Sequence, residues 1–108
     1  MPNRHLCSHL LEIFIEGQSQ LPGVVNLEQI GPNDAIVASE QALPTHAEVI
    51  LRTEGFTAPA SVEVCFRRET DYEALLVFRD GFRWSAEAWT PDHLFRVEQI
   101  AKGAAGSQ

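Results

Sequence analysis

The fold of this chain follows from two segments, Ser61–Arg68 (SVEVCFRR) and Tyr72–Arg79 (YEALLVFR). Both are short, rich in β-branched and aromatic residues and alternate in polarity, which is typical of β-strands. The residues between them, Glu69-Thr70-Asp71, suit a three-residue hairpin loop, because Asp tolerates the left-handed backbone conformation that such a loop needs. The pattern therefore predicts an antiparallel hairpin.

This loop sets a register in which Arg67 lies opposite Glu73. One face of the hairpin is then uniformly apolar and is expected to form part of the core. That face consists of Val62, Val64, Phe66, Ala74, Leu76 and Phe78. The opposite face carries Cys65, Leu75 and Val77, which need a cover. We expect the C-terminal segment to supply this cover.

Further segments with the same strand pattern precede the hairpin, separated by turns such as Gly31-Pro32-Asn33-Asp34. They span residues 10–16, 24–30, 35–39 and 47–53. Five or six strands spaced by about ten residues, without a long helical pattern, indicate an antiparallel barrel or sandwich. Because open edges invite pairing with other chains, so small a sheet must close or be covered.

The C-terminal region carries a signal for the start of a helix. Thr90-Pro91-Asp92 combines a capping hydroxyl, a proline at the first helical position and an acid in the first turn. Its inward face would consist of Leu94, Val97 and Ile100. Trp84 and Trp89 precede this helix and are expected to anchor it to the barrel. The alternative is an aromatic platform for a nucleotide base.

Length and composition suit one soluble domain. The 108 residues are 44% hydrophobic and 21% charged, and we expect a single domain over residues 1–100 with a flexible tail at 101–108. No apolar run approaches the ~20 residues of a membrane span. Glu12 and Glu16 interrupt the apolar stretch near the N-terminus, which is unlike a signal peptide. We therefore expect a cytoplasmic protein without membrane insertion.

The charge balance argues against nucleic acid as a partner. Asp and Glu number 15 against 8 Lys and Arg, for a net charge of −7, whereas a nucleic-acid surface needs an excess of cations. Arg67, Arg68, Arg79 and Arg83 are close in sequence, but a hairpin separates them, so they are interpreted as solvated strand ends. In a reducing cytoplasm, Cys7 and Cys65 are expected to be free thiols.

The segment His5-Leu6-Cys7-Ser8-His9 is a candidate metal site, because alternate residues of a strand share one face. Neighbours on that face are about 6.6 Å apart, too far to share one ion without bending, and structural zinc sites use four ligands. An irregular lead-in to the first strand is the preferred interpretation, and no metal is predicted. The sequence lacks the common nucleophile, zinc-protease and nucleotide-loop motifs, so no enzyme and no cofactor are predicted.

One segment indicates a family. Asn26–Gly31 (NLEQIG) has the form N-x-E-x-x-G and follows Arg4. This pattern resembles the PilZ domain family, whose signature is R-x-x-x-R followed by [D/N]-x-S-x-x-G. The similarity runs from Leu6 to about Phe95 and includes LCSHLLEI, ALPTHAEVILR, VEVCFRRETDYEALLVF and RWSAEAWTPDHL. The resemblance implies a six-stranded antiparallel β-barrel with a short C-terminal helix.

In that family the two motifs bind cyclic di-GMP, a bacterial second messenger. The resemblance carries this role to five candidate ligand-binding residues of this chain: Arg4, Ser8, Asn26, Glu28 and Gly31. Three positions depart from the family pattern. Ser8 stands in place of the second arginine, Glu28 in place of the serine, and Leu75 where a glycine is common. The Glu28 carboxylate would repel the phosphates of the ligand.

The leading hypothesis is therefore a PilZ-like regulatory or binding module with weak or lost cyclic di-GMP affinity that acts through protein–protein contacts. One alternative is a functional cyclic di-GMP receptor, in which another arginine assists Arg4 and Asn26 contacts the base. A second alternative is a small metal-binding protein that uses the two histidines and the cysteine of residues 5–9. On the residues alone, Asn26 and Gly31 are also explained as an asparagine and a turn glycine that end a strand.

Overall fold

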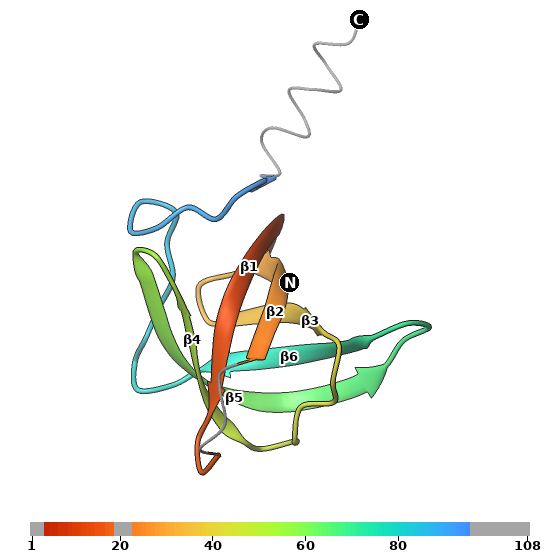
Figure 1. Cartoon of the computed structure of the whole chain (residues 1–108). Helices are drawn as coiled ribbons and strands as arrows, with labels where there is room; N and C mark the ends of the chain where they lie inside the picture. Colours follow the sequence, from red (N-terminus) through yellow and green to blue (C-terminus); the bar gives the residue numbers. More distant parts are fainter. Residues whose placement is uncertain (1–3, 19–22, 96–108) are drawn as a thin grey trace, which may run out of the picture.

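The computed structural model describes residues 4–18 and 23–95 of the chain. These residues form a closed antiparallel β-barrel with the strand order β1-β2-β3-β6-β5-β4 (Figure 1). The strands are β1 (His5–Ile15), β2 (Gly23–Ile30), β3 (Asp34–Ser39), β4 (Glu48–Thr53), β5 (Phe56–Arg67) and β6 (Tyr72–Phe78). The predicted all-β, six-stranded barrel is confirmed.

Aliphatic side chains from all six strands fill the barrel. Residues alternate between the interior and the outer face, as the two-residue repeat of a strand requires. The largest fully buried side chains are Leu11, Leu27, Ile30, Leu51, Leu76, Val37, Val49 and Val62. Each such side chain contributes roughly 1.5–3 kcal/mol through removal of apolar surface from water. Burial of this core is what closes the sheet into a barrel.

The β5–β6 hairpin forms where it was predicted, but its register differs. Arg67 pairs with Tyr72 rather than with Glu73, and a β-bulge lies between Val62 and Val64. The turn is tighter than the predicted three-residue loop, because the Arg68 amide donates a hydrogen bond to the Asp71 carbonyl oxygen at 2.8 Å and these two residues face each other. The bulge adds one residue to β5 and so changes which side chains face inward in the last part of that strand.

The prediction of an apolar inner face is therefore correct for one part of the hairpin and wrong for the other. Val62, Leu76 and Phe78 are buried, whereas Val64 and Phe66 are 42% and 48% exposed. Cys65, which was predicted on the outer face, packs against the core instead. Figure 1 shows this end of the hairpin extending away from the rest of the barrel.

The last part of the segment 84–95, residues 92–95, lies along β1 and completes its edge. The Ser8 amide donates a hydrogen bond to the Asp92 carbonyl oxygen at 3.1 Å, and the Phe95 amide donates to the Leu6 carbonyl oxygen at 2.6 Å. β4 pairs with β1 only along the second half of that strand. The C-terminal segment therefore satisfies backbone groups of β1 that β4 does not reach.

The predicted start of a helix at Thr90 is wrong, since the chain forms a turn at Asp92 and then a strand-like bridge at Phe95. The described residues contain no helix. Backbone pairing with β1 outweighs the local helix signal at this point. Val97, Ile100 and the predicted tail at 101–108 lie outside the described residues.

Both tryptophans pack against the barrel, although the segment that they anchor is not the predicted helix. Trp84 is 5% exposed, and Trp89 stacks on the Phe56 ring with 4.3 Å between centroids. The hydrogen bonds and ring contacts of the segment are with β1, the start of β5 and the turn at Pro32. Among the hydrogen bonds and ring contacts of residues 84–95, none involves Cys65, Leu75 or Val77, for which a cover was expected.

Strand β1 begins at His5, earlier than predicted. The segment predicted to be an irregular lead-in is therefore part of β1, which has one bulge between Leu6 and His9.

In residues 4–18 and 23–95, no helix is long and apolar enough to cross a membrane.

Candidate functional site

The structure brings two of the five candidate residues together. Ser8 lies on β1 and Asn26 on the neighbouring strand β2. The Ser8 hydroxyl donates a hydrogen bond to the Asn26 side-chain oxygen at 3.3 Å. This pair lies on the outer surface of the barrel, where its remaining polar atoms can contact a ligand or a partner.

Arg4 is directed to the end of β2 and the start of β3. Its Nη1 donates to Asp34 Oδ2 at 3.0 Å, and its Nε donates to Gln29 Oε1 at 3.4 Å. Both members of the Arg4–Asp34 ion pair are half-buried. The guanidinium that the motif would supply to a phosphate is therefore already paired with a carboxylate.

Glu28 lies at a β-bulge of β2 and is paired with an arginine that the sequence did not single out as a site residue. Arg68 donates from Nη1 to Glu28 Oε1 at 3.1 Å and from Nη2 to Oε2 at 3.3 Å. The same guanidinium binds Asp71 through two hydrogen bonds of 2.7 and 2.6 Å and Glu73 through one of 3.0 Å. We call this group of Arg68, Glu28, Asp71 and Glu73 the Arg68 cluster.

The Arg68 cluster perturbs the ionisation of its members. The hydrogen bonds and positive charge of Arg68 hold the pKa of Asp71 below its ordinary value. The hydrogen bonds that Arg68 donates to Asp71, and then those to Glu28, raise the pKa of Arg68. Arg68 and Asp71 therefore remain charged near neutral pH. The interpretation of Arg68 as a solvated strand end is wrong, because Arg68 is paired with three carboxylates. The local pattern did not reveal this, since Glu28 is 40 residues away in sequence.

Gly31 is buried at the end of β2, where its amide donates a hydrogen bond to the Asp34 carbonyl oxygen at 2.9 Å. This contact closes the turn between β2 and β3. The geometry matches the simpler explanation of Gly31 as a turn residue that ends a strand.

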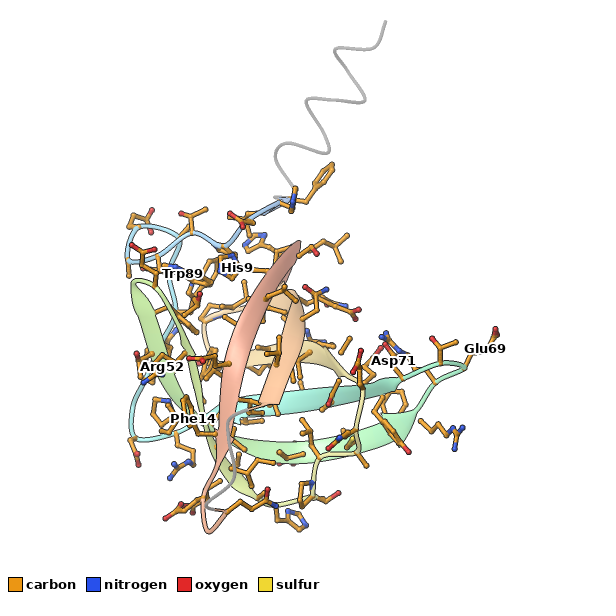
Figure 2. The ribbon with its side chains drawn as sticks, in the orientation of Figure 1. His9, Phe14, Arg52, Glu69, Asp71 and Trp89 are labelled. Carbon is orange, nitrogen blue, oxygen red and sulfur yellow. The ribbon has the colours of Figure 1, made fainter. Side chains whose placement is uncertain are left out.

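The residues of the candidate metal site share one face of β1 but have separate partners. His9 accepts a hydrogen bond at Nδ1 from the Asp92 amide at 2.9 Å, and its Nε2 lies 3.3 Å from Thr53 Oγ1. Figure 2 shows His9 beside Trp89. Within the described residues, no three His, Cys, Asp or Glu side chains are grouped to hold a metal ion.

The other two residues of that candidate site face the barrel. The His5 ring lies 6.0 Å from the Trp84 ring between centroids. Cys7 Sγ lies 3.6 Å from the Leu27 carbonyl oxygen, and burial raises the pKa of the Cys7 thiol to about 12. A protonated thiol is a poor metal ligand.

An exposed apolar surface lies next to the Ser8–Asn26 pair. Leu10 on β1 is 67% exposed and Val24 on β2 is 59% exposed. Leu10 pairs with Asn26, and Glu12, two residues further along β1, pairs with Val24. Strand alternation therefore places all these side chains on one outer face. We call Leu10, Val24, Ser8 and Asn26 the β1–β2 face; its apolar part was not predicted, because exposure depends on the register of the barrel.

No protein-family model, curated protein or solved structure matches this chain. The fold and the site define the class of this protein as a six-stranded closed antiparallel β-barrel, with a short segment of the chain covering the edge of its first strand.

Proposed function

We propose that this protein is a PilZ-like regulatory module that has no enzymatic activity, has lost tight binding of cyclic di-GMP, and acts by binding another protein. The observation that carries the proposal is the Arg68 cluster, in which Glu28 occupies the signature-strand position and binds an arginine. The barrel order and the N-x-E-x-x-G strand are compatible with a divergent PilZ domain.

Electrostatics disfavours a dinucleotide at this site. Arg4, which is itself a candidate residue, and Arg68, which binds the candidate Glu28, are paired with four carboxylates. A ligand with two phosphates would bring further negative charge to a region whose cations are already engaged. Breaking such charge-assisted hydrogen bonds leaves carboxylates unpaired, which costs affinity.

The β1–β2 face supports binding to a protein instead. Leu10 and Val24 are diagonal neighbours on adjacent strands, two residues apart in register, and both are more than half exposed. Contiguous exposed apolar side chains with polar neighbours are typical of protein interaction sites. The Ser8–Asn26 pair supplies hydrogen-bonding groups at the border of this surface.

Calorimetric titration with cyclic di-GMP tests the proposal. We expect no binding with a Kd below about 10 μM. A tighter isotherm would favour the alternative, a true receptor in which another arginine assists Arg4.

A gain-of-function variant tests the assignment of the site. Glu28→Ser combined with Ser8→Arg restores the two signature motifs, leaves Leu75 unchanged and is expected to create measurable dinucleotide binding. The matched control is Glu63→Ser combined with Ser8→Arg, which removes one exposed carboxylate away from the Arg68 cluster. Equal behaviour of the two double variants, with the fold retained, would mean that the motif is mapped onto the wrong residues.

A further inference from the structure

The exposed apolar pair on β1 and β2 separates two hollows of the outer surface. The hollow toward β4 has a volume of about 540 Å³ and is lined by Leu10, Val24, Glu12, Arg52 and Glu54, among others. The hollow toward β3 has a volume of about 340 Å³ and also includes Leu10 and Val24. An apolar ridge between two hollows can hold a segment that inserts a side chain on each side.

Carboxylates surround this ridge. Glu12 and Glu54 line the hollow toward β4, and Glu40 and Asp71 line the hollow toward β3. Glu40 and Glu54 are exposed. The border of the ridge is therefore predominantly negative, as is the whole chain with its net charge of −7.

The cation among these lining residues is already engaged. Arg52 Nη2 lies 2.9 Å from Glu12 Oε1, and the Arg52 guanidinium lies 4.6 Å from the centre of the Phe14 ring (Figure 2). Arg52 therefore neutralises Glu12 and leaves the charges of Glu40 and Glu54 to act on whatever approaches the ridge.

This charge distribution selects the occupant. A second copy of the chain would bring a second negative border against the first, and like charges across an interface are unfavourable. Nucleic acids and anionic lipid surfaces meet the same repulsion. A partner with positive charges beside apolar side chains is bound more tightly, because its apolar side chains pack on the ridge and its positive charges are attracted to the carboxylates at the border.

We propose that the β1–β2 face binds a basic segment of another protein, which places apolar side chains in the two hollows beside Leu10 and Val24 and positive charges near Glu40 and Glu54. This inference rests on the function proposed above and specifies the chemistry of the partner. It does not depend on any residue of the Arg68 cluster except Asp71, which contributes to one hollow.

Selection from a displayed library of random peptides on the full chain tests this inference. We expect the selected peptides to combine Lys or Arg with large apolar residues, and to lose affinity as the salt concentration rises. Measured by fluorescence anisotropy, Leu10→Gln and Val24→Gln should each weaken binding at least about tenfold. The matched control Val64→Gln changes another exposed strand valine and should leave the affinity within about twofold.

Two double variants with the same change in net charge test whether the carboxylates beside the ridge attract the peptide. Glu40→Lys combined with Glu54→Lys should weaken the selected peptides at least about tenfold, whereas Glu63→Lys combined with Glu69→Lys makes the same change in net charge elsewhere and should have a smaller effect. All these side chains are exposed, so circular dichroism should show that the variants keep the fold.

Several results would overturn the inference. These are the absence of selected peptides, selection of neutral or acidic peptides, binding that survives Val24→Gln, or a dimer in analytical ultracentrifugation that Val24→Gln dissociates. The dinucleotide titration separates the two proposals. Tight cyclic di-GMP binding overturns the proposed function, whereas failed peptide selection without dinucleotide binding overturns only the identity of the partner.

Discussion

At the scale of single residues, Cys7 shows how the barrel suppresses a reactive group. Its side chain lies on the inward face of β1 with Sγ 3.6 Å from a carbonyl oxygen of β2. Burial, with a smaller contribution from the charge of Glu28, raises the pKa of the thiol from 9.0 to about 12. Since the thiolate is the nucleophile, folding makes Cys7 inert at neutral pH.

Alkylation kinetics test this effect. In a Cys65→Ser variant, Cys7 is expected to react with iodoacetamide at pH 8 at least about 100-fold more slowly in the folded chain than in denaturant. Similar rates in the two states would mean that the thiol is accessible and ionised in the folded protein.

The same shift gives Cys7 a pH-dependent effect on stability. Between about pH 9 and 12 the folded state holds a proton that the unfolded state has lost. The contribution of Cys7 to the free energy of unfolding is therefore complete below pH 9 and decreases as the pH rises toward 12. Cys7→Ala should reduce this loss of stability in denaturation experiments at pH 8 and pH 10.5. If the free energy of unfolding fell equally between pH 8 and pH 10.5 in the variant and in the unchanged protein, Cys7 would not be the source of this pH dependence.

At the scale of elements, the Arg68 cluster joins the β5–β6 hairpin to β2. Figure 2 shows Asp71 where the hairpin leaves the barrel and Glu69 at its tip. β2 and β6 are not neighbours in the barrel, because β3 lies between them. The guanidinium of Arg68 therefore connects elements that share no backbone hydrogen bonds, and it offsets the repulsion among three carboxylates.

Loss of this connection should destabilise the fold. Arg68→Met is expected to lower the melting temperature more than Arg67→Met, a matched change at an exposed neighbour. Because Arg68 lowers the pKa of Asp71, this contribution is present above the ordinary carboxyl pKa of 3.8 and is lost as the pH falls through the lowered value. The difference between the two variants should therefore shrink in thermal melts at strongly acidic pH. Equal melting temperatures at pH 7 would contradict the structural role of Arg68.

At the scale of the whole molecule, residues 84–95 hold one end of the barrel together. The Trp84 amide donates to the Pro32 carbonyl oxygen at 3.0 Å, and the Trp84 indole donates to the Trp89 carbonyl oxygen at 2.9 Å. Trp89 in turn packs on Phe56 and on His9. This segment thus contacts the β2–β3 turn, β1 and β5 at once.

Substitution of the buried indole tests whether this segment belongs to the cooperative fold. Trp84→Ala is expected to lower the free energy of unfolding by about 3–5 kcal/mol, as for other large-to-small changes in a core. Trp84→Phe keeps a ring but loses the hydrogen bond to Trp89, so it should cost less. Chemical denaturation followed by circular dichroism measures both values. A loss below about 1 kcal/mol for Trp84→Ala would mean that the segment unfolds independently.

The sequence alone indicated five or six strands and their approximate positions. Each strand is encoded by its own short pattern of alternating or apolar residues and by the turn residues at its ends, which are local properties. A sheet this small has to bury one face and satisfy its edges, so the strand pattern indicated a barrel or a sandwich, and the six-stranded barrel was what the family resemblance implied. The proximity of Ser8 and Asn26 also follows, once β1 and β2 are taken as antiparallel neighbours.

Tertiary structure decided the features that depend on distant residues. The bulge in β5 exposes Val64 and Phe66, because neighbouring strands and not the loop set the register there. Phe95 pairs with β1 in place of a helix, since the unpaired edge of that strand outweighs a local capping signal. The positive charge that binds Glu28 belongs to Arg68, which is 40 residues away in sequence. Local patterns specify which residues face the same side of a strand. Which residues come into contact depends on the pairing of strand edges, the filling of the core and the pairing of charges, and these involve residues distant in sequence.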